Sequence, residues 1–127
     1  MPFSPFVMIN TNIKGLHMPL TDALKAYVHE KVSSLENLVS PGAFLYAEIG
    51  KPSHHHKGGE DVFQAEITLD TNGQTYFVKT TESDLYRAID RAAADMLDMV
   101  KQGRGKRQTL LRRGRMAIKQ LLKRGGL

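Results

Sequence analysis

The chain has 127 residues, of which 41% are apolar, and it contains no cysteine. This length allows one domain with a short appendage, and the lack of cysteine excludes disulfide bonds, thiolate metal ligands and a cysteine nucleophile. No run approaches the roughly 18 apolar residues that a membrane helix needs, and the first residues do not form a signal-peptide pattern. We therefore expect a soluble, cytoplasmic protein.

The formal net charge of +5 is distributed unevenly along the chain. Residues 1–100 carry 8 Lys and Arg against 13 Asp and Glu, whereas residues 101–127 carry 10 Lys and Arg and no acidic residue. Such asymmetry indicates a polyanionic partner for the C-terminal segment, either nucleic acid or an anionic membrane surface. A merely solubilising tail is the alternative, although it would need far fewer charges.

The first predicted elements are a strand and a helix. Residues 6–14 alternate in polarity, as a half-buried strand does, and Gly15 ends the pattern. Apolar residues then recur at helical spacing from 20 to 38, with Thr21 as a suitable N-cap. Lys31 lies close to the centre of this apolar stripe, where a simple amphipathic helix would not place a charge.

Three strands are predicted next, at 43–49, 62–70 and 74–80, and Asn72-Gly73 predicts a two-residue hairpin turn between the last two. By alternation, we expect one face of the sheet to be largely polar and to carry the following side chains: Tyr46, Glu48, Gln64, Glu66, Thr68, Tyr76 and Val78.

A second helix is predicted to begin near Ser83 or Asp84, either of which can cap it, and to end at Gly103. The resulting order predicts an α+β fold, a two-layer β-α-β-β-β-α sandwich in which a four-stranded sheet carries two helices on one face. The place of the first strand in the sheet does not follow from the sequence. We divide the chain into a domain at 1–102 and a basic tail at 103–127, which we expect to be flexible or helical only on contact with RNA.

Two separated segments resemble a known family. The sequence LTDALKAYV at 20–28, followed by Lys31 and Leu35, resembles the first helix of the ribosome hibernation factors of the hibernation promoting factor and ribosome-associated inhibitor A (protein Y) type. DLYRAID at 84–90 resembles the second-helix signature of that family, and the segments at 55–57 and 62–66 match a pattern seen in some members. The resemblance covers about residues 10–106, with the elements in the same order.

This resemblance implies a fold similar to that of double-stranded-RNA-binding domains and a non-catalytic function. Members bind the small ribosomal subunit, against its rRNA in the channel where mRNA and tRNA pass, and block both. The implied partner is therefore the small subunit and its rRNA, with no cofactor, no small-molecule substrate and no membrane, and we expect a monomer. Long members add a C-terminal dimerisation domain, for which the residues after Lys106 are too few.

The resemblance also implies which basic residues contact rRNA phosphates, a mode that suits recognition of RNA by shape. The positions that match the family are Lys25, Lys31, Lys79, Arg87, Arg91, Lys101 and Lys106. In the tail, a glycine-arginine composition typical of flexible RNA-binding segments adds Arg104, Arg107, Arg112, Arg113 and Arg115. A polar loop that we expect to contact RNA contains His54, His55, His56 and Lys57. We expect Asp84 and Asp90 to be structural, capping the helix and orienting neighbouring arginines.

The residues leave other functions open. One is a general RNA-binding module or RNA chaperone that is not dedicated to ribosomes. The stretch at 109–124 also fits a basic amphipathic helix on an anionic membrane. The histidine run at 54–56 is the one candidate metal site, which a metal-dependent nuclease would use, but adjacent loop residues make poor joint ligands. We therefore expect neither a metal ion nor a catalytic residue.

Overall fold

The computed structural model describes residues 9–52, 62–103 and 105–107. Within these ranges the elements are β1 (Asn10–Leu16), α1 (Asp22–Val32), the 3-10 helix η1 (Ser33–Leu38), β2 (Phe44–Gly50), β3 (Phe63–Thr71), β4 (Gln74–Glu82), α2 (Leu85–Gln102) and β5 (Lys106–Arg107). None of the helices described in these ranges is both long and apolar enough to cross a bilayer.

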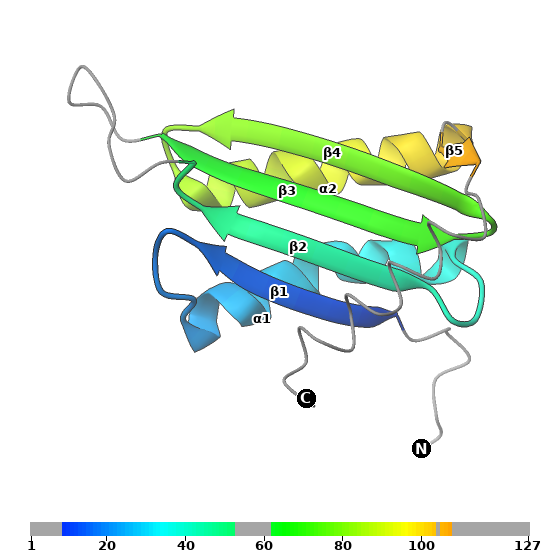
Figure 1. The fold of residues 1–127 in the computed structure, drawn as a ribbon, viewed down its shortest axis with the longest axis horizontal. Coiled ribbons are helices and arrows are strands. Elements are labelled where there is room, and N and C mark those ends of the chain that lie inside the picture. Colours follow the sequence, from blue (N-terminus) through cyan, green and yellow to red (C-terminus); the bar gives the residue numbers. More distant parts are fainter. Residues whose placement is uncertain (1–8, 53–61, 104, 108–127) are drawn as a thin grey trace.

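The strands form one mixed sheet in the order β1-β2-β3-β4-β5, and α1 and α2 both lie on the same face of it (Figure 1). β1 pairs with β2 in parallel, while the other neighbours are antiparallel. The predicted two-layer α+β fold with both helices on one face is therefore confirmed. The parallel pair follows from the connection, because only a crossover such as the one through α1 brings two consecutive strands side by side in parallel.

The sheet also contains an element that the sequence did not predict. Lys106 and Arg107 form the two-residue strand β5, which pairs with Gln74 and Thr75 at the beginning of β4. The four predicted strands thus have a short fifth neighbour, and the sheet continues past residue 102.

The core lies between the sheet and the helical layer, which we define as α1, η1 and α2. Leu45, Ile67 and Leu69 from the central strands are at most 1% exposed. On α2, Ala88 and Ala92 are fully buried, and their small side chains let the helix backbone approach the sheet closely. This packing fixes α2 in place and so determines where its polar side chains emerge.

Alternation along β4 differs from the prediction. Tyr76 and Val78 lie opposite Leu69 and Ile67 of β3, and both belong to the core. Residues directly opposite each other in a ladder share a face. The exposed face of the sheet, which we call the open face, therefore carries the side chains of the alternate positions of β4, including Phe77 and Lys79. The prediction for Tyr76 and Val78 was wrong.

The hairpin turn explains this register. Asn72 and Gly73 both have positive φ, at 56° and 75°, as the predicted two-residue turn requires. Such a turn places Gln74 opposite Thr71, which puts Tyr76 on the same face as Leu69.

The first helix is shorter than its apolar stripe. α1 ends at Val32 and the chain continues as η1 to Leu38, so Leu35 is still fully buried. The hydroxyl of Ser33 donates to the carbonyl of Glu30 at 2.7 Å, and that of Ser34 donates to Lys31 at 3.4 Å. Serine hydroxyls that bond to preceding carbonyls compete with the helical backbone bonds, which accounts for the change of helix type here.

Both helices begin at a capping side chain. Thr21 Oγ1 accepts a hydrogen bond from the Leu24 amide at 3.1 Å, as predicted. At α2 the cap is Asp84, whose Oδ2 accepts from the Arg87 amide at 3.3 Å. At the other end of α2, Gly103 adopts the left-handed conformation with φ of 66°, which glycine adopts without steric cost.

We expect Asp84→Ala to lower the free energy of unfolding by about 1 kcal/mol, because one amide at the start of α2 loses its partner. Urea denaturation followed by circular dichroism measures this change. Ser83→Ala is the matched control, since Ser83 precedes the cap position. An equal loss in both variants would show that Asp84 does not cap the helix.

Candidate nucleic-acid interface

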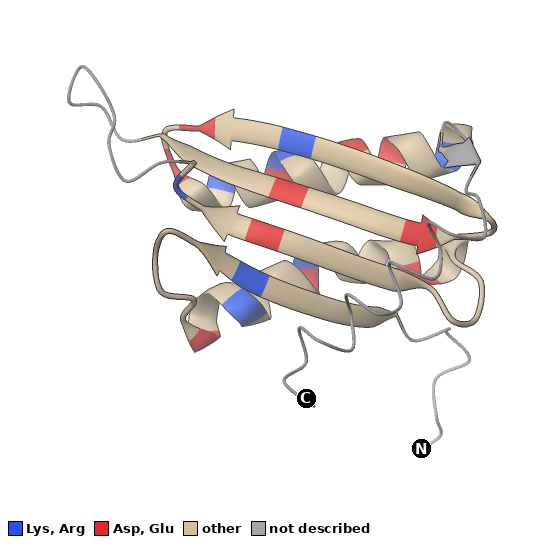
Figure 2. Cartoon of the chain, in the orientation of Figure 1, with Lys and Arg blue, Asp and Glu red and all other residues tan. Residues whose placement is uncertain are grey.

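Five of the predicted RNA-binding residues lie in the helical layer. Lys25 and Lys31 are on α1, whereas Arg87, Arg91 and Lys101 are on α2. All are solvent-exposed except Lys31, whose side chain is 37% exposed. The fold therefore brings these cations to one side of the molecule, behind the sheet in the view of Figure 2.

Lys31 belongs to a polar cluster that joins the two helices. Its Nζ lies 3.3 Å from Asp90 Oδ1 on α2 and 5.4 Å from the centre of the Tyr27 ring. Tyr27 Oη donates a hydrogen bond to the same Asp90 oxygen at 2.6 Å, and its ring packs edge-on against Tyr86 with centroids 4.7 Å apart. The contacts with Asp90 and Tyr27 thus explain the position of Lys31 near the apolar stripe.

Asp90 is the main cause of the pKa shifts of Lys31 and Tyr27 in this cluster. The hydrogen bond that Asp90 accepts from the ammonium raises the pKa of Lys31, and the one that it accepts from the phenol raises the pKa of Tyr27. Asp90 connects α1 and α2, and its described partners are Lys31 and Tyr27 in place of the arginines that we expected. Because Asp90 compensates the charge of Lys31, this lysine attracts a phosphate less strongly than an unpaired cation does.

Arg87 and Arg91 lie one turn apart on α2 and share one carboxylate. Arg87 Nε lies 4.0 Å from Glu82 Oε1, and Arg91 Nη1 donates to Glu82 Oε2. The arginine side chains are 71% and 57% exposed, against 17% for Glu82. Two guanidinium groups therefore face solvent with Glu82 as their shared ion-pair partner, and Glu82 holds both close to the beginning of α2.

The hydrogen bond from Arg91 lowers the pKa of Glu82 below its ordinary value of 4.5. A carboxyl whose pKa is lower in the folded state stabilises the fold above its unfolded pKa, and this contribution is lost as the pH falls through the folded value. We therefore expect the difference in unfolding free energy between the native protein and Glu82→Gln to be largest at neutral pH, to shrink as the pH falls below 4.5, and to vanish below the lower pKa of the folded state. Urea denaturation at a series of pH values measures it; a constant difference would contradict the pairing.

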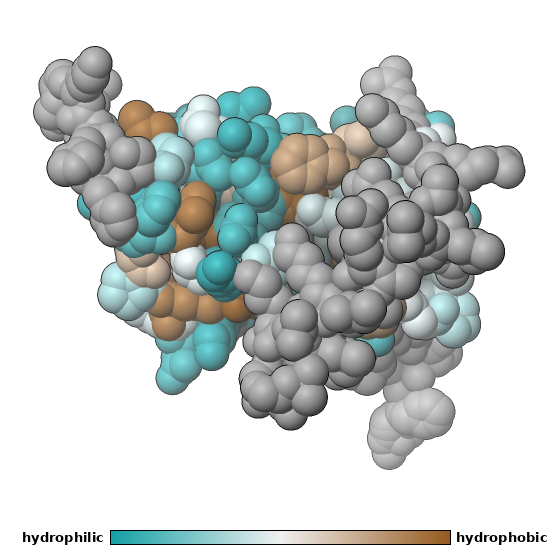
Figure 3. All heavy atoms as spheres, in the orientation of Figure 1, coloured by the Kyte–Doolittle hydropathy of each residue, from teal (hydrophilic) through white to brown (hydrophobic). Residues whose placement is uncertain are grey.

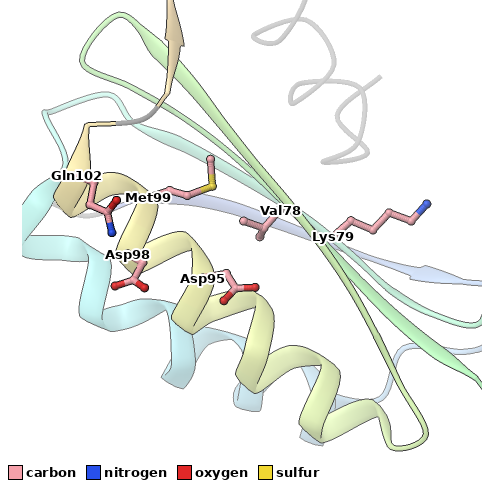
Figure 4. Close-up of a pocket in the computed structure, with 6 residues that line it drawn as sticks. All are labelled: Val78, Lys79, Asp95, Asp98, Met99 and Gln102. Carbon is pink, nitrogen blue, oxygen red and sulfur yellow. The ribbon is translucent and has the colours of Figure 1, made fainter.

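Lys79 lies apart from the other predicted residues. It is on the open face, and its side chain points away from α2 (Figure 4). The strand registers place four charges in one row across the sheet: Lys14, Glu48, Glu66 and Lys79. Figure 2 shows this row as blue, red, red and blue bands. An RNA that contacts Lys79 must therefore lie on the side opposite the helical layer, so Lys79 and the five predicted cations of that layer do not form one surface.

Where Figure 3 shows the open face, hydrophobic residues lie among hydrophilic ones. Phe77 is 49% exposed. The sequence interpretation missed this residue, although the two-residue hairpin turn places it opposite Thr68 on the open face. Tyr46 is only 7% exposed and donates to Glu48 Oε2 at 3.2 Å. Burial raises the pKa of Tyr46 to about 12, so its phenol stays neutral at physiological pH.

The second half of α2 is acidic. A groove between β4 and α2 is lined by Asp95 and Asp98 together with Met99, Gln102, Val78 and Lys79 (Figure 4). The exposed cations of α2 are thus divided, with Arg87 and Arg91 near its first turns and Lys101 in its last turn. A polyanion that follows α2 along its whole length would meet these carboxylates.

The remaining predicted residues lie either in β5 or outside the described ranges. Lys106 and Arg107 form β5. Outside the described residues lie His54, His55, His56, Lys57, Arg104, Arg112, Arg113 and Arg115. Within the part of the chain that the structure describes, no group of three or more His, Asp or Glu side chains is placed to hold a metal ion.

This fold is shared with solved structures of ribosome-associated proteins. The N-terminal domain of Protein Y from Thermus thermophilus matches with a TM-score of 0.61 and 26% sequence identity, over 74% of this chain and 96% of that one. A ribosomal subunit interface protein from Coxiella burnetii matches with a TM-score of 0.61 over 76% of this chain and 98% of its own; at 12% identity this likeness shows the fold alone. The domain therefore has the fold of the ribosomal subunit interface proteins.

The chain belongs to the sigma 54 modulation protein / S30EA ribosomal protein family, whose model matches residues 11–108. A ribosome hibernation promotion factor from Lactococcus lactis subsp. cremoris (strain MG1363) is 30% identical over 83 residues, which are 65% of this chain and 43% of the relative. The chain thus spans less than half the length of that relative. The predicted resemblance to the ribosome hibernation factors is confirmed.

Proposed function

We propose that the protein is a non-catalytic inhibitor of translation that binds the small ribosomal subunit and occupies the path of mRNA and tRNA. The observation that carries this proposal is the family match over residues 11–108, together with the exposed cations that the fold collects in its helical layer. We place this function in the cytoplasm, with the protein acting as a monomer.

The chemistry of the helical layer supports rRNA as the target. Arg87 and Arg91 present two guanidinium groups, each able to donate to phosphate oxygens in a fixed geometry. Contacts of this kind fix a protein on structured RNA without reading bases. Inhibition then needs no reaction, because an occupied channel excludes mRNA and tRNA sterically.

The two segments of the chain have different roles in this proposal. Residues 1–102 form the unit that binds the subunit, and the basic segment at 103–127 adds electrostatic affinity for RNA. β5 attaches the beginning of this segment to β4. The described part of this segment therefore ends at the edge of the sheet, at Arg107.

Competition on purified small subunits tests this proposal. We expect tRNA with a matching mRNA to displace labelled protein, and the protein to stop synthesis in a cell-free translation assay. Binding that tRNA and mRNA leave unchanged would contradict occupancy of the channel. That outcome would favour the alternative of a general RNA-binding module or RNA chaperone, which the charge of the tail also supports.

A further inference from the structure

The outer edge of β1 forms a groove with α1. β1 is the terminal strand of the sheet and pairs only with β2 among the described strands (Figure 1). The groove is lined by Thr11, Asn12, Ile13, Lys25 and His29. Lys25 was predicted to bind RNA, whereas His29 and the strand edge have no role in the proposed function so far.

The backbone of β1 supplies hydrogen-bonding groups to this groove. The Asn10 amide donates to the Ala43 carbonyl at 3.0 Å, and the Leu16 carbonyl accepts from the Lys51 amide at 2.8 Å. In a parallel ladder, alternate residues direct both backbone groups to the same neighbour. Residues of even number in β1 therefore face β2, and the amides and carbonyls of Thr11 and Ile13 point to the outer edge.

The side chains of the groove include one cation, Lys25, and the imidazole of His29. Lys25 and His29 are four residues apart, so they project from the same face of α1, and both are exposed. The five lining residues include no carboxylate. The equivalent groove at the opposite edge of the sheet differs in this respect, because Asp95 and Asp98 line it (Figure 4).

We propose that the β1–α1 groove binds a ribose-phosphate segment of an RNA strand. The outward amides of Thr11 and Ile13, about 6.6 Å apart on an extended strand, donate to successive phosphates. Lys25 and His29 add side-chain donors, and the outward carbonyls accept from the ribose 2′-hydroxyl. A phosphate needs hydrogen-bond donors, and a 2′-hydroxyl needs an acceptor that DNA leaves unused. The strand edge beside Lys25 and His29 offers both, whereas Asp95 and Asp98 of the groove at the other edge repel phosphate. This inference extends the proposed function, since it names the part of the RNA that one edge of the domain holds.

The direct test is a titration of the ¹⁵N-labelled full-length protein, followed by amide NMR. The probes are a hexamer of uridylate, a hexamer of thymidylate and inorganic phosphate. We expect the amide signals of Thr11 and Ile13 to shift with the ribo-oligomer, and to shift less with the deoxy-oligomer or with phosphate. Equal shifts with both oligomers would overturn the 2′-hydroxyl contact, and unchanged Thr11 and Ile13 signals would overturn the groove itself.

Variants connect the groove with the ribosome. We expect Lys25→Gln combined with His29→Gln to weaken binding to small subunits about tenfold, because the charge-assisted hydrogen bond of Lys25 and the imidazole donor of His29 are lost. Gln102→Ala in the α2–β4 groove is the control and should bind as the native protein does. Thr11→Pro removes one outward amide without removing a bond to β2, and we expect a further loss of affinity.

The outcomes separate this inference from the proposed function. If the groove variants bind like the native protein while Arg87→Gln with Arg91→Gln loses affinity, the groove proposal fails and the proposed function stands. If the native protein does not bind subunits but its Thr11 and Ile13 amides respond to the ribo-oligomer, the proposed function fails and the groove remains an RNA site.

Discussion

Replacing Arg87 and Arg91 together by glutamine should weaken binding to the small ribosomal subunit by about tenfold or more, because hydrogen bonds between charged groups are lost at each position. The slope of log affinity against log salt should also fall by about two, one for each phosphate contact removed. Both side chains are more than half exposed, so we expect the domain to stay folded. Sedimentation at several salt concentrations measures both quantities.

A second double variant decides which face of the domain contacts rRNA. Lys14→Gln with Lys79→Gln removes the same charge from the open face, where both residues lie in one row across the sheet. We expect it to lose less affinity than the arginine variant. Equal losses would show that binding depends on overall charge and not on the helical layer.

The substitution Ile67→Ala should lower the free energy of unfolding by about 2–5 kcal/mol. Ile67 is 1% exposed in the centre of the sheet, so truncation leaves a cavity between β3 and the helices. For a domain of this size the loss is a large part of the total stability. Thermal or urea denaturation measures it, with the exposed Thr81→Ala as the control, which should change stability by at most about 0.5 kcal/mol.

The same variant distinguishes ribosome binding by the folded domain from binding by the basic tail. At a temperature where Ile67→Ala is unfolded and the native protein is folded, the basic segment at 103–127 has the same charge in both. If the folded domain recognises the ribosome, only the native protein binds. If the variant binds equally well, the charge of the tail accounts for the affinity.

Much of the fold follows from local chemistry in the sequence. The cap at Thr21 and the turn at Asn72-Gly73 lie where their residue types predict them. The turn also determines the register of β4, because a two-residue connection fixes which residues of the two strands lie opposite each other. Counting from the turn places Tyr76 opposite Leu69, whereas alternation along β4 alone placed it on the wrong face. The pairing of β1 with β2 was not predictable, since it depends on contacts between residues more than thirty positions apart.

The candidate site was predictable as a set of residues but not as a surface. The unusual place of Lys31 signalled a partner, yet nothing local identifies Asp90, which is 59 positions away. Likewise, only the folded chain shows that Glu82 pairs with both Arg87 and Arg91. Lys79 matched the family by position, but alternation along β4 sends its side chain to the other face. His29 was missed because its neighbour in space is the edge of β1, which the sequence did not locate.

Cosedimentation with ribosomal subunits through a sucrose gradient tests the central claim most directly. The full-length protein is compared with a version that ends after Arg107, which keeps β5 and removes only residues 108–127. We predict that both versions migrate with the small subunit at moderate salt, and that the full-length protein binds more tightly. Absence of binding by both versions, or binding by the full-length protein alone, would contradict the account.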